Sequence, residues 1–114
     1  MIENSIIDIN DFIKIDMRVG EIVKVENLDW SNKLLKLQVD FGAEIGVRNV
    51  LSGIKKWYSS EELLNKRFVF VINLNERIIK NEVSQAMILM IEGKHKPLGW
   101  QSVSDEAELG AKVG

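Results

Sequence analysis

The amino-acid sequence predicts a mainly β domain of five strands, with one short helix between the third and fourth strands. Three observations lead to this prediction. Apolar and polar residues alternate in the first half of the chain, and two later runs are almost continuously apolar over the length of a strand. A single helix-start signal stands between these two groups. With 114 residues, 46% of them hydrophobic, the chain can bury one core, so we expect residues 1–114 to form a single domain.

The first strand is expected over residues 15–25. Apolar residues occupy every second position from Ile15 to Val19, and the alternation shifts just after Gly20. A glycine at such a break indicates a bulge or a sharp bend, which a strongly coiled strand in a small barrel requires.

The second strand is expected over residues 35–41, where four apolar residues alternate with polar ones. Lys36 and Gln38 therefore point outward together. A third strand is expected over residues 47–51, after a turn at Gly46.

The helix is expected to begin at Ser59. Ser59 and Glu62 have the spacing of a capping box, and Leu63 and Leu64 would supply the buried face. The fourth and fifth strands then follow over residues 68–72 and 86–91. This order is that of an OB-fold, a five-stranded Greek-key barrel whose face and loops bind oligonucleotides or oligosaccharides, here with terminal extensions.

The composition argues against catalysis and against a bound cofactor or metal. The chain has no cysteine, and its single histidine, His95, lies between two lysines, where we interpret it as an exposed loop residue. No zinc-site spacing and no glycine-rich phosphate loop are present. No apolar run has the length of a membrane span, and the first eleven residues are acidic, so we expect a soluble, cytoplasmic protein that is not an enzyme.

The charges are unevenly distributed along the chain. The formal net charge is −2, but residues 30–81 hold nine basic residues against five acidic ones, a net charge of +4. A basic centre framed by acidic ends is typical of a small polyanion site on a soluble protein. Ordinary solvated surface charge is the alternative interpretation.

The candidate binding residues combine cations with neutral hydrogen-bonding side chains. Phosphate contacts need flexible or forked cations, and neutral side chains can reach sugar hydroxyls and bases. Trp30 and Trp57 are possible stacking platforms, although a tryptophan beside an apolar run more often packs in the core, which is the alternative interpretation. The cations are Lys33, Lys36, Lys55, Lys56, Arg77 and Lys80, and the neutral residues are Ser52, Asn73, Ser84 and Gln85.

These segments also resemble a known family. The stretch DFIKIDMRVGEIVKVE, Asp11 to Glu26, resembles the opening of the tRNA-binding domain. That domain is shared by the C-terminal ends of bacterial methionyl-tRNA synthetases, freestanding tRNA-binding proteins and mammalian cytokine-like synthetase cofactors. The resemblance continues through SNKLLKLQVDFG, VLSGIKKWYSSEELLNKRFVFVINL, VSQAMILM and ELGAKVG, and so covers nearly the whole chain.

The resemblance implies an OB-fold that binds tRNA by shape and phosphate backbone and assists an aminoacyl-tRNA synthetase of the methionyl type. Two departures from the family pattern are Ala86, where the family has glycine, and Glu76, where it has proline before the arginine. Both suggest a reduced affinity. The positions that match the family's contacts are Lys33, Ser52 and Gly53, Asn73 and Arg77, and Ser84 to Met87.

Two alternatives remain open within the same superfamily. The stretch VDFGAEIGV, Val39 to Val47, resembles the CsaA-type secretion chaperones, which hold unfolded peptides. A module that docks on a synthetase without touching RNA is the other alternative. Freestanding relatives resemble homodimers joined through their termini, so we expect a dimerising C-terminal extension over about residues 93–114. The apolar residues available for it are Ile2, Ile6, Ile7, Leu98, Trp100, Leu109 and Val113.

Overall fold

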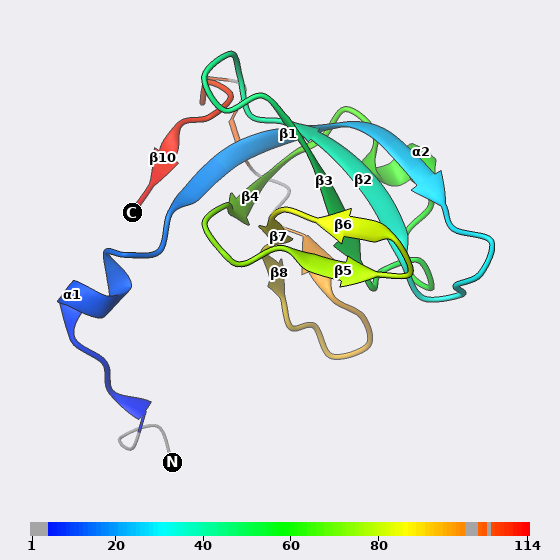
Figure 1. Ribbon diagram of the computed structural model, residues 1–114, viewed down its shortest axis with the longest axis horizontal. Coiled ribbons are helices and arrows are strands. Elements are labelled where there is room, and N and C mark those ends of the chain that lie inside the picture. Colours follow the sequence, from blue (N-terminus) through cyan, green and yellow to red (C-terminus); the bar gives the residue numbers. More distant parts are fainter. Residues whose placement is uncertain (1–4, 100–102, 105) are drawn as a thin grey trace.

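The computed structural model describes residues 5–99, 103, 104 and 106–114, and it confirms a mainly β fold (Figure 1). The central sheet has six strands; five form its continuous path, the sixth pairs beside the first, and one helical turn lies between the third and fourth strands of the chain. The elements of this core are β1 (Met17–Asn27), β2 (Leu35–Asp40), β3 (Val47–Ser52), α2 (Ser60–Leu63), β4 (Arg67–Val71) and β7 (Met87–Ile88).

The central sheet runs in the order β3-β2-β1-β4-β7, and its pairings are antiparallel. The long, curved β1 passes through the middle of the sheet, as Figure 1 shows. Smaller elements surround it: α1 (Ile9–Phe12), the hairpin of β5 (Arg77–Ile79) and β6 (Glu82–Ser84), the pair of β8 (Met90–Ile91) and β9 (Leu98–Gly99), and β10 (Lys112–Val113), which pairs with β1.

One backbone and two side-chain hydrogen bonds, rather than a regular ladder, close the barrel between β3 and residues 84 and 85. The Gln85 backbone N–H donates to the Asn49 carbonyl at 2.8 Å, and the Asn49 N–H donates to Gln85 Oε1 at 2.9 Å. The Leu51 N–H donates to the buried Ser84 Oγ at 3.0 Å. The polar residues before the last apolar run therefore satisfy the open edge of β3, which would otherwise leave buried N–H groups unpaired.

The irregularity in β1 lies beyond the expected position. The register between β1 and β2 shifts between Ile22 and Lys24, whereas Gly20 pairs regularly with a residue of β4. A Cβ at Gly20 would lie 2.5 Å from Val39 Cγ1 and 2.6 Å from a ring carbon of Phe41. The predicted irregularity is therefore present, but it begins two residues after Gly20, and the glycine itself is required by close packing against the core.

The helix start was predicted correctly, but half of its buried face was not. Ser59 caps α2, and Ser59 and Glu62 form both hydrogen bonds of the capping box. Leu63 is buried, whereas Leu64 is 41% exposed. Leu64 already has an extended backbone conformation, with ψ near 135°, so its side chain leaves the helical face.

The core lies inside the curved sheet and contains the inward residues of the alternating strands. Leu35, Leu37 and Val39 are fully buried, and the Phe41 and Phe70 rings pack edge to face at 5.3 Å between centroids. The expected strand over residues 86–91 is instead two short strands. β7 pairs with β4, whereas β8 pairs with β9, so the segment changes its partner within five residues.

The described part of the C-terminal tail runs along β1. The Gly110 N–H donates to the Val19 carbonyl at 2.8 Å, and the Val19 N–H donates to the Ala111 carbonyl at 3.0 Å. The tail thus wraps the barrel there. Ile2 and Trp100, two of the apolar residues expected at a dimer contact, lie outside the described residues.

Within the part of the chain that the structure describes, no helix has the length and apolar character that a membrane span requires. The same residues contain no group of three or more His, Cys, Asp or Glu side chains that could hold a metal ion.

Candidate nucleic-acid interface

The tip of the β5–β6 hairpin meets the loop between β1 and β2. Lys80 and Asn81 adopt positive φ angles of 47° and 69°, the left-handed conformations that a tight hairpin turn requires. This turn carries the Lys80 Nζ to 5.4 Å from the centre of the Trp30 ring. A cation and an aromatic ring from distant parts of the sequence therefore lie together.

The loop after β3 is tied to the same β1–β2 loop. The Lys55 N–H donates to the Lys33 carbonyl at 3.1 Å. The Lys55 Nζ donates to the Ser31 carbonyl at 2.7 Å and to the Leu28 carbonyl at 3.4 Å. Lys55, an expected RNA contact, thus uses its charge to brace the two loops.

A hollow of about 650 Å³ opens between these loops. Lys56 extends its Nζ to 5.8 Å from the centre of the Trp57 ring. Trp57 is 37% exposed and Trp30 is 40% exposed, so neither is a core residue and the alternative of core packing was wrong. The residues that line the hollow are Asn32, Lys33, Gly53, Lys56 and Trp57.

Lys36 on the outer face of β2 is held by an acid from the hairpin. Its Nζ lies 2.9 Å from Glu82 Oε1 on β6, and both side chains are largely shielded from solvent. The hydrogen bond to Glu82 raises the pKa of Lys36 above its ordinary value, and burial opposes this shift. Lys36 is therefore charged but already neutralised by a neighbour.

Arg77 and Met87 are exposed side chains near the edge of β3. They line a small hollow of about 70 Å³ together with Leu51 and Ser84. Arg77 is in register with Ser84 across the β5–β6 pair. Ser52, at the end of β3, is half-buried and in register with Leu35.

Ser84 and Gln85 are occupied by the closure of the barrel. The Ser84 hydroxyl accepts from the Leu51 N–H and donates to the Ala86 carbonyl at 3.2 Å. Gln85 Nε2 donates to Glu76 Oε2 at 3.4 Å. Glu76, the acid expected to weaken the site, therefore lies close to the Gln85 amide.

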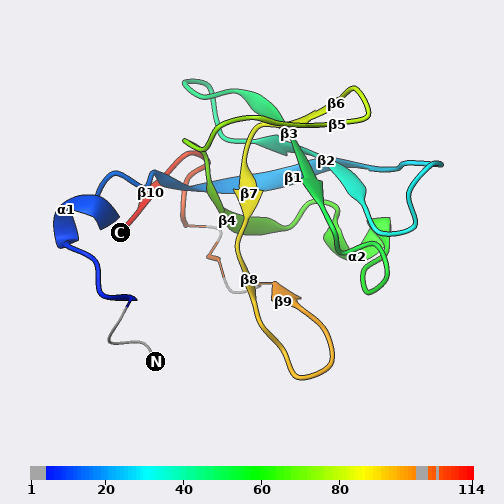
Figure 2. The ribbon, with the colours of Figure 1, turned by 60° about the horizontal axis from the view of Figure 1, so that its bottom comes forward.

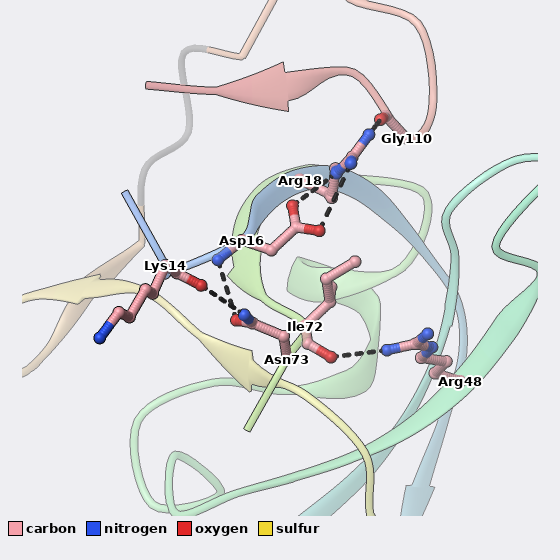
Figure 3. A network of polar contacts seen from close by, with 7 residues as sticks. All are labelled: Lys14, Asp16, Arg18, Arg48, Ile72, Asn73 and Gly110. Carbon is pink, nitrogen blue, oxygen red and sulfur yellow. Dashed lines mark hydrogen bonds and ion pairs between the residues drawn. The ribbon is translucent and has the colours of Figure 1, made fainter. Parts of the chain in front are cut away.

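Asn73 lies after β4, where it holds the segment that enters β1 (Figure 3). The Asp16 N–H donates to Asn73 Oδ1 at 2.8 Å, and Asn73 Nδ2 donates to the Lys14 carbonyl at 2.6 Å. Arg18 joins Asp16 to the Gly110 carbonyl, as the same figure shows. Asn73 is thus part of a clamp between β4, the N-terminal segment and the tail.

The expected site residues therefore divide into groups. Lys33 and Lys80 lie at the loop end of the barrel, while Lys36, Arg77 and Met87 lie on or near the adjoining hairpin. Lys55, Asn73, Ser84 and Gln85 make contacts that hold the fold, and Ser52 is half-buried at the end of β3. Asn32 lines the hollow but was missed, and the only sequence signal for it is its place beside Lys33 in a polar turn.

Comparisons with known proteins bear on the whole fold. Residues 17–112 match the family described as "Putative tRNA binding domain". The chain is 46% identical over 110 residues to methionine–tRNA ligase of Chlorobium phaeobacteroides, a match that covers 96% of this chain and 15% of that ligase. The chain thus spans only a small part of that curated relative.

Two solved structures have the same fold over almost their full lengths. One is a MetRS-related protein from Pyrococcus horikoshii, with a TM-score of 0.85 and 34% identity, and the match covers 96% of this chain and 98% of that one. The other is a CsaA chaperone protein from Picrophilus torridus, with a TM-score of 0.87 and 33% identity, and the match covers 96% and 100% of the two chains.

Proposed function

The chain belongs to the tRNA-binding domain family, and from this premise we propose a non-catalytic module that binds tRNA by its shape and phosphate backbone. In this proposal the module assists an aminoacyl-tRNA synthetase of the methionyl type in cytoplasmic protein synthesis. The observation that carries the proposal is the position of four exposed cations, Lys33, Lys56, Arg77 and Lys80, on loops and a hairpin that adjoin one another.

These four cations differ from Lys36 and Arg67, two other basic residues of the chain's centre. None of them forms an ion pair with a carboxylate of the described residues. Lys36 and Arg67, by contrast, pair with Glu82 and Glu21. A cation without an acidic partner can neutralise a phosphate and so release counterions condensed on the nucleic acid, which contributes a large share of the affinity.

We assign the expected residues to two roles. Lys33, Arg77, Lys80, Met87 and Ser52 would contact the RNA directly, and Lys36 would contribute to the extent that Glu82 releases it. Lys55, Asn73, Ser84 and Gln85 would shape the surface, because their polar atoms already bind the protein's own backbone.

Binding of mixed tRNA over a series of KCl concentrations tests the proposal. Affinity should fall steeply with salt, and Lys33→Ala or Arg77→Ala should reduce both the affinity and the salt slope, by about one unit of slope each. Lys112→Ala is the matched control, because β10 lies at the opposite end of the molecule from the hairpin tip in Figures 1 and 2. A loss as large in the control as in the two variants would contradict the proposed interface.

A second candidate function is binding of unfolded peptides. The similarity to the CsaA chaperone favours it, as do the exposed apolar side chains of Leu74, Ile78 and Met87 around the hairpin. Denatured protein that binds as tightly as tRNA, without dependence on salt, would support this alternative. A synthetase that binds the chain equally well after both substitutions would instead support a docking module.

We also propose a homodimer joined through the terminal segments. Ile6, Ile7, Ile9 and Ile13 are exposed on the N-terminal segment, which projects from the barrel in Figures 1 and 2. Sedimentation equilibrium should give twice the chain mass. A monomer at micromolar concentration would contradict this part of the proposal.

A further inference from the structure

We propose that the hollow between the β1–β2 loop and the loop after β3 binds one unpaired nucleobase, which stacks on Trp57 while the adjoining phosphates contact Lys33 and Lys56. This inference rests on the proposed RNA-binding function. It adds a base contact to an interface otherwise argued from shape and phosphates.

The Trp57 ring is held toward solvent by the residues around it. Its neighbour Tyr58 is buried and donates its hydroxyl to the Pro97 carbonyl at 2.7 Å. Ile54 is also buried, and its carbonyl accepts from the N–H groups of both Trp57 and Tyr58 at 3.0 Å. The turn that carries Trp57 is therefore anchored on both sides. Burial of the indole ring would stabilise the fold, but the anchored turn keeps the ring partly in water.

The walls of the hollow are joined before any ligand arrives. Lys55 links the two loops through its backbone N–H and its Nζ. Within the β1–β2 loop, Ser31 Oγ accepts from the N–H groups of Lys33 and Leu34 at 3.2 and 3.0 Å. A preformed site loses little conformational entropy on binding, which favours a specific ligand.

Gly53 lines the hollow, and the packing of the fold does not require a glycine at this position. A Cβ at this position would meet no atom within 4 Å, and the backbone is outside the left-handed region that favours glycine. By contrast, a Cβ at Gly20 would collide with core side chains. Packing therefore does not explain the glycine at position 53, whereas close approach of a ligand to the backbone does.

The chemistry of the lining selects among ligands. The hollow of about 650 Å³ is within the range of small-molecule sites. Trp57 provides a stacking face, and the Asn32 amide can both donate to and accept from a base edge. Lys33 and Lys56 lack carboxylate partners among the described residues, which favours an anionic ligand over an apolar peptide side chain.

Two RNAs of equal length test the inference: a hairpin with an unpaired loop and a blunt duplex. Trp57→Ala should weaken hairpin binding by about 5- to 150-fold, the range for one base–aromatic stack, and leave duplex binding unchanged. The salt slope should not change, because no charge is removed. Trp57→Phe should retain part of the affinity.

Gly53→Val is the second variant, since it keeps Trp57 and both lysines, and its Cβ would meet no atom within 4 Å. It should also weaken hairpin binding selectively, with a melting temperature equal to that of the wild type. Hairpin affinities within twofold of the wild type for both Trp57→Ala and Gly53→Val, or equal losses for both RNAs, would overturn the inference. Failure of the wild-type chain to bind either RNA or tRNA would instead overturn the proposed function.

Discussion

Replacement of Ser84 by alanine tests whether this polar residue serves the fold or the RNA. Ser84 is only 7% exposed, and its hydroxyl accepts a hydrogen bond from the Leu51 N–H at 3.0 Å. Leu51 is buried as well. Removing the hydroxyl leaves that N–H without its protein partner in a largely buried position. A buried unpaired polar group costs about 1–3 kcal/mol, and the Ala86 carbonyl loses a donor in addition. The expected decrease in the free energy of unfolding is therefore about 1–3 kcal/mol.

Thermal and urea denaturation followed by circular dichroism measure this decrease. For a domain of this size, about 1–3 kcal/mol corresponds to a melting temperature roughly 4–12 °C lower. Ser52→Ala on β3 is the matched control, because its hydroxyl forms no hydrogen bond with the described residues. Among folded molecules, Ser84→Ala should keep the wild-type salt slope for tRNA. A change in unfolding free energy below about 0.5 kcal/mol would refute the argument that this hydroxyl closes the barrel.

Three further predictions concern the core, the interface and the helix cap. Gly20→Ala should lower the free energy of unfolding by about 1–3 kcal/mol or more, because its Cβ would overlap two core side chains, and an unchanged urea midpoint would contradict this. Glu82→Gln should raise tRNA affinity and steepen the salt slope by about one unit, since it frees the Lys36 amine from its ion pair. A salt slope equal to that of the wild type would mean that Lys36 does not contact the RNA. Hydrogen bonds from the Ser59 backbone and side chain lower the pKa of Glu62 below its ordinary value of 4.5. The stabilisation that the ionised Glu62 carboxylate provides is present above pH 4.5 and is lost as pH falls through the lower folded-state pKa. The melting temperature of Glu62→Gln should therefore fall less steeply toward acid pH than that of the wild type. An equally steep fall in the variant would count against a stabilising role of the cap.

The parts of the fold that depend on local rules could be predicted from the sequence. The alternation over residues 35–41 reports directly which side chains face the core, and the Ser59–Glu62 spacing reports a helix start. The prediction failed where a residue's role depends on distant atoms. The sequence could not show that packing requires Gly20, because the side chains that exclude a Cβ there come from β2 and the residue after it.

The candidate site could be predicted only in part for the same reason. The sequence does not report whether the amine of a lysine faces water or binds a carbonyl. Lys55 and Lys56 are adjacent in sequence, yet Lys55 binds the Ser31 carbonyl while Lys56 lies over an exposed indole ring. Only the folded chain decides which of the two remains available to a ligand.

The sequence by itself determined the order of the first four strands of the core and the helix between them, and the concentration of positive charge in the middle of the chain, because periodicity, capping and charge are local properties. The tertiary structure alone decided that Ser84 and Gln85 complete the β3 edge, that Lys36 meets Glu82, and that Trp30 and Trp57 face outward. The physical reason is that a polar side chain takes whichever partner the fold brings within hydrogen-bonding distance, and that partner can lie more than thirty residues away.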